Sequence, residues 1–401
     1  MSPLDTPAPV RSAKQVRTAA DLAVNGAPAM FSQPLHVGRP NVGNHEAFLA
    51  RTRGILERQW LSNNGPVAQE FEAAIARYLG VRHCIAMCNG TIALEIATRA
   101  LDMHGEVIVP SYTFIATAHA LQWQEITPIF ADIDRDTHNL DPDAVRRMIT
   151  PRTTGILGVH LWGRPAPVEA LQAIAQEHGL SLMFDASHGF GCSHRGVLLG
   201  GFGQCEVFSF HATKFFNTFE GGAVVTNDDE LAEKMRLMRN FGFVDYDKVI
   251  YPGTNGKLTE IAAAMGLTNL EDLDRFVAIN RRNYEIYRNG LGGVPGLRLL
   301  GYDEAERNNY QYIVVEVGAA FPVSRDRLIQ VLHAENVLAR RYFWPGCHNM
   351  EPYRSFYPHA GLMLPMTNEV ATKVVVLPTG SALSADDVGG ILELIRAVAR
   401  G

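Results

Sequence analysis

The chain has 401 residues, of which 47% are hydrophobic and 19% are charged, and its net charge at pH 7 is −6. A chain of this length and hydrophobic content can bury a large core, so we expect one large and one smaller domain and, without a basic bias, no nucleic-acid partner. Its five cysteines fit neither a disulfide framework nor paired metal ligands, and neither a secretory leader nor a membrane-length apolar run stands out, so we expect a cytoplasmic protein with no metal and no membrane partner.

The first part of the chain has no regular pattern, whereas the following part alternates between two patterns. Residues 1–30 lack clear periodicity, and we expect them to be a mobile N-terminal extension. Alternation of strand-like and helix-like segments predicts an α/β fold with a mostly parallel sheet between helices, and with ligands at the carboxyl ends of the strands. The strands are predicted at residues 106–110, 127–132, 154–160 and 181–185, and the helices at residues 115–122, 142–149 and 167–178.

The second half of the chain adds to this sheet and then changes character. Residues 206–210 and 223–227 predict two more strands, and residues 260–289 predict a long helical region. A smaller α+β part follows, with a strand predicted at residues 311–317 and helices at residues 325–334 and 384–399. We therefore expect a large domain over residues 31–270, and a linking helix with a small C-terminal domain over residues 271–401.

An anion-binding turn is predicted near residue 90. A short apolar run ends at Asn89-Gly90-Thr91, and a helical pattern begins at Ile92. Such a junction directs free backbone N–H groups and the positive end of a helix dipole toward one point, where a phosphate fits. The same three residues could also form an ordinary helix cap, and this segment alone leaves that alternative open.

Two other strand ends carry side chains suited to pyridoxal phosphate chemistry. Lys214 lies between two strand-like runs, and Asp185 ends a third run with His188 three residues later. This chemistry needs a lysine to hold the aldehyde of the cofactor and a carboxylate to keep its pyridine nitrogen protonated. A partly desolvated lysine also loses its proton more readily, so it can act as acid and base. In the alternative, structural interpretation, Lys214 lays its aliphatic stem along the surface with its ammonium in water, and Asp185 caps a helix.

Ordered motifs between about residue 62 and residue 378 carry a family resemblance. They include Asn63-Asn64-Gly65-Pro66, Val109-Pro-Ser-Tyr-Thr-Phe-Ile-Ala-Thr117, Val159-His-Leu-Trp-Gly163, Asp185-Ala-Ser-His188, Glu220-Gly-Gly-Ala223 and Gly253-Thr-Asn-Gly-Lys-Leu-Thr-Glu260. With these motifs the chain resembles the sugar aminotransferases of the DegT/DnrJ/EryC1/StrS family, within the fold-type I, aspartate aminotransferase-like enzymes. The resemblance implies pyridoxal 5'-phosphate as cofactor and a three-layer PLP-transferase fold with a smaller C-terminal α+β domain.

The resemblance also implies roles for single residues. Lys214 matches the Schiff-base lysine of the family, Asp185 the partner of the pyridinium nitrogen, and His188 the residue that hydrogen-bonds the phenolic oxygen of the cofactor. The other matches are the phosphate ligands Gly90, Thr91 and Ser209, the ring-stacking Phe114, and Asn255, which in this family reaches the cofactor phosphate from the neighbouring subunit. The match at Asn255 implies a homodimer with shared active sites. Alternatively, Phe114 could belong to the core, and His188 could be a hydrogen-bonded histidine that does not touch the cofactor. Ser209 could bond only within the sheet, and Asn255 could only end a loop.

The residues around Lys214 bear on the reaction. Some members of the family replace this lysine by histidine and act as dehydratases, so Lys214 argues against that activity. The segments His211-Ala-Thr-Lys214 and Phe219-Glu-Gly-Gly222 resemble members that aminate C4 of a nucleotide-linked 4-keto-6-deoxyhexose more than members that aminate C3. The resemblance therefore implies transfer of an amino group from glutamate to C4 of dTDP-4-keto-6-deoxyglucose, in deoxyaminosugar biosynthesis for an antibiotic or a polysaccharide.

Three alternatives stay open from the sequence. They are a C3 (3-keto sugar) aminotransferase, a keto-cyclitol aminotransferase and a non-catalytic sensor on the same fold. The residues that recognise the sugar carry no transferable signature. The segment Arg341-Tyr-Phe-Trp-Pro345 is one candidate, although its aromatic side chains could equally belong to the core.

Overall fold

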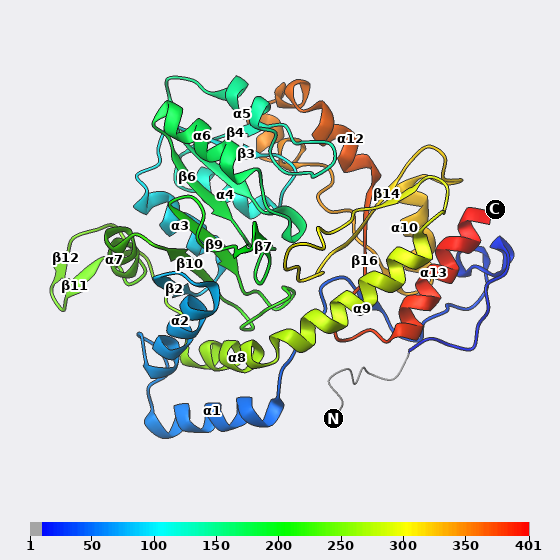
Figure 1. The fold of residues 1–401 in the computed structure, drawn as a ribbon, viewed down its shortest axis with the longest axis horizontal. Coiled ribbons are helices and arrows are strands. Elements are labelled where there is room, and N and C mark those ends of the chain that lie inside the picture. The colour runs from blue at the N-terminus through cyan, green and yellow to red at the C-terminus, as the bar shows by residue number, and fades with distance from the viewer. Residues whose placement is uncertain (1–9, 401) are drawn as a thin grey trace.

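A seven-stranded sheet forms the centre of the larger domain in the computed structural model, which describes residues 10–400 (Figure 1). β10 is antiparallel to both of its neighbours, whereas the pairs from β9 across to β4 are parallel. The carboxyl ends of β6 and β9 therefore lie side by side. In order across the sheet, the strands are β2 (His83–Met87), β10 (Gly222–Thr226), β9 (Cys205–Ser209), β6 (Ser181–Asp185), β5 (Thr153–Val159), β3 (Glu106–Pro110) and β4 (Thr127–Ala131).

Helices cover both faces of this sheet, so the domain has three layers. Every residue of β3 and of β10 is buried, as expected for strands covered on both faces. The predicted three-layer α/β fold is confirmed. One face packs against α3 (Gly90–Ala100), α4 (Ile115–Gln122) and α7 (Asp229–Met238), and the other against α2 (Pro66–Leu79), α5 (Pro142–Met148) and α6 (Val168–His178).

A long helical region connects the two domains, but it is not one continuous helix. α8 (Glu260–Glu271) packs against α2 and α1 (His45–Arg58), and α9 (Leu273–Leu291) runs on to the smaller domain (Figure 1). Asp272 separates α8 from α9, with φ −100° and ψ 7°. Its carboxylate accepts a hydrogen bond from Arg275 Nε at 3.2 Å. The predicted region contains no proline, so its pattern gave no sign of this break.

The smaller domain contains a three-stranded antiparallel sheet covered by helices. The sheet order is β13 (Leu297–Leu299), β14 (Ile313–Val317) and β16 (Val374–Leu377). Helices α9, α10 (Arg325–Ala334) and α13 (Ala385–Arg400) share its apolar core. The remaining strands and α-helices of the described chain are the parallel pair β1 (Leu35–His36) and β15 (Val337–Leu338), the hairpins β7 (Ser193–His194) with β8 (Val197–Leu198) and β11 (Phe243–Asp245) with β12 (Lys248–Val249), and the helices α11 (Tyr353–Phe356) and α12 (Pro365–Lys373).

The segment before β1 differs from its prediction. Val16, Leu22 and Met30 are at most 3% exposed and belong to the same core as α10 and α13. Residues 10–30 are therefore an ordered part of the smaller domain and not a mobile extension, while the prediction for residues 1–9 lies outside the described residues. Apolar residues that are widely spaced and lie outside regular helices and strands produce no periodicity, which is why the sequence pattern missed this packing.

No helix within residues 10–400 combines the length and the apolar character needed to cross a membrane. In the same part of the chain, no three or more His, Cys, Asp or Glu side chains form a group that could hold a metal ion.

Candidate active site

The three predicted catalytic side chains come from adjacent strand ends. Asp185 is the last residue of β6, His188 follows it by one turn, and Lys214 lies in the loop between β9 and β10. β6 and β9 are parallel neighbours, so the loops that leave their carboxyl ends meet at one edge of the sheet. This is the edge at which open α/β sheets bind ligands.

Lys214 is half-buried in a tightly hydrogen-bonded loop. Its backbone N–H donates to His211 O at 2.8 Å, and Phe210 N donates to Gly221 O at 2.8 Å across the base of the loop. Burial lowers the pKa of the Lys214 ammonium from 10.5 to about 8, although the negative charge of Asp185 opposes the shift. The amine of Lys214 can therefore lose its proton much more easily than a lysine in water.

Asp185 is only 6% exposed, and both of its carboxylate oxygens accept a hydrogen bond from the protein. Thr117 Oγ1 donates to Oδ2 at 2.9 Å, and Ser187 N donates to Oδ1 at 3.0 Å. Thr117 belongs to the motif that ends at this residue, but nothing in the sequence distinguishes its hydroxyl from the others in the motif. The structure therefore adds Thr117 to the candidate site.

His188 is buried in a cage of aromatic rings. Its ring lies parallel to those of Trp162 and Phe343, and its centroid is 4.5 Å from that of Tyr312. Burial and the nearby positive charge of Lys214 lower the pKa of His188 well below its usual value, so the imidazole is neutral at pH 7.

The tautomer of His188 follows from a backbone contact. Trp162 N–H donates to His188 Nδ1 at 3.3 Å, so the neutral ring carries its proton on Nε2 and can donate from that atom. Trp162 has a positive φ of 61°, an uncommon conformation for a residue with a side chain, and it orients the N–H group toward the imidazole. The sequence included Trp162 in a motif but assigned it no role.

The predicted phosphate ligands are brought together at the start of α3. Asn89 caps this helix by accepting a hydrogen bond from Ile92 N at 2.8 Å, which leaves the first N–H groups of the helix, on Gly90 and Thr91, without an intrahelical acceptor. A Cβ atom on Gly90 would lie 2.9 Å from Ser209 Cβ, so only glycine allows this approach. These two N–H groups and the hydroxyls of Thr91 and Ser209 fit a phosphate group.

Phe114 and Asn255 are both exposed. The side chain of Phe114 is 55% exposed where β3 leads into α4, so it does not belong to the core. Asn255 pairs through its backbone with Asn240, and the adjacent Gly256 O accepts a hydrogen bond from Cys88 N at 2.8 Å. Within one chain Asn255 thus lies beside the strand that leads into the phosphate turn, and its contact across a dimer stays a prediction.

The candidate sugar-binding segment divides between core and surface. Phe343 is buried and stacks on Trp162 with ring centroids 5.1 Å apart, whereas Trp344 is 42% exposed. Tyr342 lies between these extremes, parallel to Phe343 at 5.0 Å. The segment therefore lies next to His188, but only Tyr342 and Trp344 present accessible ring surface.

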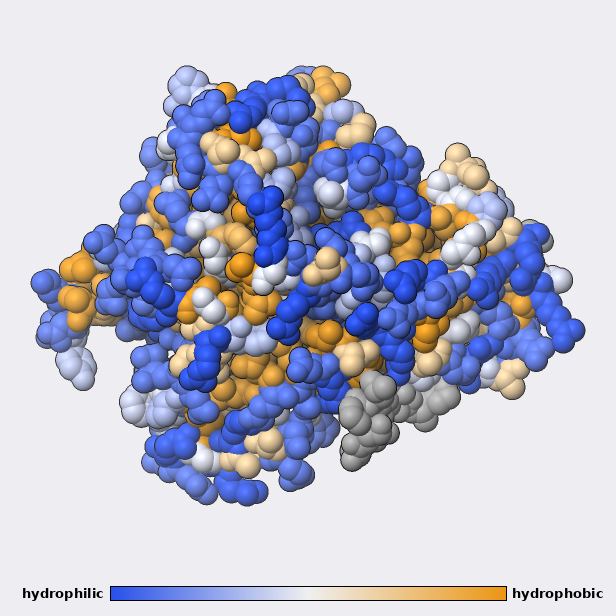
Figure 2. All heavy atoms as spheres, viewed as in Figure 1, coloured by the Kyte–Doolittle hydropathy of each residue, from blue (hydrophilic) through white to orange (hydrophobic). Residues whose placement is uncertain are grey.

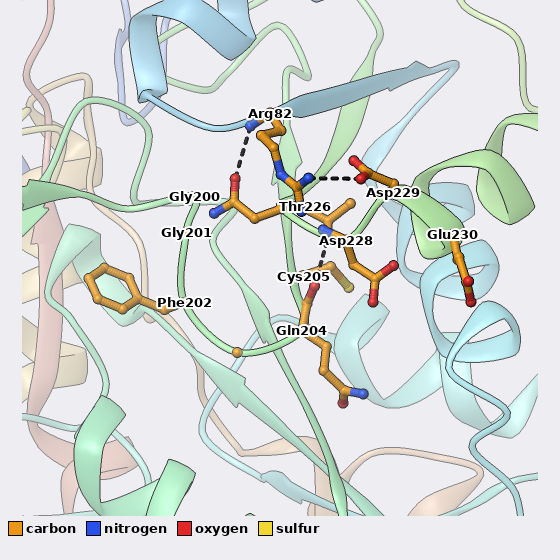
Figure 3. A pocket seen from close by; sticks show the side chains of 12 residues that line it. Arg82, Gly200, Gly201, Phe202, Gln204, Cys205, Thr226, Asp228, Asp229 and Glu230 are labelled. Carbon is orange, nitrogen blue, oxygen red and sulfur yellow. Dashed lines mark hydrogen bonds and ion pairs between the residues drawn. The ribbon is translucent and has the colours of Figure 1, made fainter.

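A cavity of about 520 Å³ lies at the opposite end of the sheet (Figure 3). Its lining includes Thr226 and Cys205, the last residue of β10 and the first of β9, and none of the predicted site residues. Figure 3 shows Arg82 directed toward Asp229, with which it forms an ion pair at 2.8 Å. The charge of Arg82 is thus neutralised within the cavity, and the cavity lies apart from the predicted catalytic side chains.

Comparisons with known proteins agree with this arrangement. The model of the DegT/DnrJ/EryC1/StrS aminotransferase family matches residues 43–396. The chain is 37% identical over 370 residues to dTDP-4-amino-4,6-dideoxy-D-glucose transaminase of Shigella dysenteriae, and this match covers 92% of this chain and 100% of that protein. It is 35% identical over 347 residues to GDP-perosamine synthase of Caulobacter vibrioides, and this match covers 84% of this chain and 91% of that protein. A solved structure of DesI in the presence of its TDP-sugar product matches with a TM-score of 0.91 and 49% identity, over 95% of this chain and 96% of that one.

Proposed function

Because this chain belongs to the DegT/DnrJ/EryC1/StrS aminotransferase family, we propose that it transfers an amino group from glutamate to C4 of dTDP-4-keto-6-deoxyglucose. The observation that carries the proposal is the half-buried Lys214: the charge of Asp185 raises its pKa, and its own charge lowers the pKa of His188. The C4 position is supported by the Shigella relative, a dTDP-4-amino-4,6-dideoxy-D-glucose transaminase, and by DesI with its TDP-sugar product. A non-catalytic sensor would not need a lysine with a lowered pKa at this point.

The residues of the site fit pyridoxal 5'-phosphate. When bound, this cofactor supplies an electron sink for the bonds at the amino-bearing carbon. Lys214 Nζ would hold its aldehyde carbon, Asp185 its pyridine nitrogen, and His188 Nε2–H its phenolic oxygen. The phosphate would be held by Gly90, Thr91, Ser209 and Asn255, and the ring would stack on Phe114, whose exposed side chain is free to receive it.

Lys214 is suited to move protons in both halves of the reaction. Its pKa of about 8 lies near the working pH, which is the condition under which one group serves best as both base and acid. In the first half-reaction Lys214 Nζ would take the α-proton of glutamate, whose amino group stays in the site while water supplies the keto oxygen of the departing 2-oxoglutarate. In the second half-reaction Lys214 Nζ would deliver a proton to C4 of the sugar, whose keto oxygen leaves as water while the retained amino group leaves on the amino sugar. His188 stays neutral throughout and therefore adds no second positive charge beside Lys214.

We also infer that the enzyme is a cytoplasmic homodimer with shared active sites. The hairpin β11–β12 and its flanks expose apolar and aromatic side chains, and Figure 2 shows apolar surface on this projecting arm at the left edge of the view. Exposed apolar clusters of this kind favour protein association. The residues are Phe241, Phe243, Val244, Tyr246, Val249 and Ile250.

The test is an absorption spectrum of the purified protein with pyridoxal phosphate, before and after glutamate is added. We expect a cofactor band that depends on Lys214 and changes on addition of glutamate, followed by amination of dTDP-4-keto-6-deoxyglucose.

Lys214→Ala should lower the amination rate at least about 100-fold, because the proton-transfer group is lost. A band that is independent of Lys214 contradicts the assignment of this residue. Faster amination of a 3-keto sugar or of a keto-cyclitol, offered in parallel, contradicts the proposed substrate.

A further inference from the structure

Two buried hydroxyls form a directed chain that ends on Asp185. Thr117 Oγ1 lies 2.9 Å from Asp185 Oδ2, and Thr113 Oγ1 lies 3.0 Å from Thr117 Oγ1. An ionised carboxylate has no proton to give, so Thr117 donates to Asp185. The single proton of Thr117 is then committed, so Thr113 must donate to Thr117. Both threonines are at most 3% exposed, so water does not compete for these hydrogen bonds.

We propose that Thr117 is a positioning residue for Asp185, and that Thr113 strengthens its hydrogen bond by polarising its hydroxyl. The inference rests on the proposed function, in which Asp185 contacts the pyridine nitrogen of the cofactor. A hydrogen bond to the charged form of a carboxylate favours that form and fixes its orientation. With Ser187 N on the other oxygen at 3.0 Å, each oxygen has one protein donor and keeps a lone pair for the cofactor.

The start of α4 positions both Phe114, the proposed stacking residue, and Thr117, which binds Asp185. Phe114 lies between the two threonines in the sequence, and Phe114 O accepts a hydrogen bond from Thr117 N at 3.1 Å. The residue proposed to stack on the ring is thus tied by one turn of backbone to the hydroxyl that orients Asp185. The backbone of this turn therefore fixes the position of Phe114 relative to Thr117, and the hydroxyl of Thr117 in turn binds Asp185.

The test compares pyridoxal phosphate with its 1-deaza analogue, in which carbon replaces the pyridine nitrogen. In the protein freed of cofactor, Thr117→Val should weaken binding of pyridoxal phosphate about tenfold, or about 1.4 kcal/mol, and leave binding of the analogue unchanged. Thr117→Ser keeps the hydroxyl and should bind both ligands as the wild type does. Thr98→Val is the matched control, because Thr98 is also fully buried in a helix, but its hydroxyl donates a hydrogen bond only to Met183 Sδ, at 3.8 Å.

Two results would overturn the inference. One is unchanged binding of pyridoxal phosphate by Thr117→Val, and the other is an equal loss for both ligands, which indicates a merely structural role. If Thr117→Val does not fold, Thr113→Val replaces it and should cause a smaller loss, about threefold, that is again specific to the ligand with the nitrogen. A wild-type protein that binds no pyridoxal phosphate contradicts the proposed function as well, whereas normal wild-type binding with no nitrogen-specific loss contradicts this inference alone.

Discussion

At the scale of single residues, burial sets the charge states on which the chemistry depends. Burial lowers the pKa of Lys214 to about 8 and the pKa of His188 well below its usual value. The positive charge of Lys214 also disfavours protonation of His188, so the site avoids holding two positive charges in a partly dry environment. The result is a lysine that exchanges protons near neutral pH and a histidine that only donates a hydrogen bond.

The reactivity of Lys214 in the cofactor-free protein should follow its lowered pKa. Only the neutral amine is nucleophilic, so labelling by trinitrobenzenesulfonate should increase with pH around a midpoint near 8 and not near 10.5. Quantification of the labelled peptide by mass spectrometry measures this rate. Because the charge of Asp185 raises the pKa of Lys214, Asp185→Asn should move the midpoint to lower pH. A midpoint at 10 or above in the folded protein contradicts the account.

At the scale of elements, a buried carboxylate holds the N-terminal segment against the smaller domain. Glu335, at the end of α10, is completely buried and accepts hydrogen bonds from Ala23 N at 2.6 Å and from Met30 N at 2.7 Å. Its charge is balanced by Lys14 Nζ at 2.8 Å. One side chain thus satisfies two backbone groups that the segment cannot pair within itself.

Glu335→Gln should loosen this segment while leaving the central sheet intact. The amide removes the negative charge opposite Lys14 and places an NH₂ group where an acceptor is needed, at a cost of about 1–3 kcal/mol. We expect a lower free energy of unfolding in urea and faster tryptic cleavage after Lys14 and Arg17. The control is Glu177→Gln, which removes a solvent-accessible ion pair with Arg146 and should change stability by less than about 1 kcal/mol. Equal cleavage rates in both variants would show that Glu335 does not anchor the segment.

At the scale of the whole molecule, two predicted site residues and an apolar hairpin lie exposed on the single chain. Phe114 and Asn255 are exposed in the single chain, and the apolar hairpin β11–β12 projects from the same domain (Figure 1). A second copy of the chain would cover such apolar surface. A homodimer in which Asn255 completes the neighbouring site accounts for both features.

Mixing two inactive variants tests whether the sites are shared. If Asn255 acts on the neighbouring subunit, a mixed dimer of Lys214→Ala and Asn255→Ala chains contains one site with both residues intact. Activity after unfolding and refolding an equimolar mixture should then reach about a quarter of the wild-type value, because about half of the dimers are mixed and each has one intact site. If Asn255 acts within its own chain, the mixture should show no more activity than the separate variants. Sedimentation analysis of the mixture verifies that dimers have formed.

The strands and the main site residues could be predicted from the sequence because their signals are local. β3, β6 and α10 lie at their predicted bounds, since apolar runs and helical periodicity depend only on neighbours in the chain. Lys214 and Asp185 stand out because pyridoxal phosphate chemistry requires these residue types at strand ends. The division of the chain at Asp272 and the packing of residues 10–30 were missed, since neither depends on a periodic pattern.

By itself, the sequence determined the layered α/β architecture and the family, and it predicted the side chains proposed to carry the chemistry. The tertiary structure alone decided how those side chains are held: which hydroxyl binds Asp185, which ring nitrogen of His188 carries its proton, and how far burial lowers the pKa of Lys214. The physical reason is distance along the chain. Thr117 and Asp185 are 68 residues apart, and no local pattern encodes a hydrogen bond between residues that only the folding of the sheet brings together.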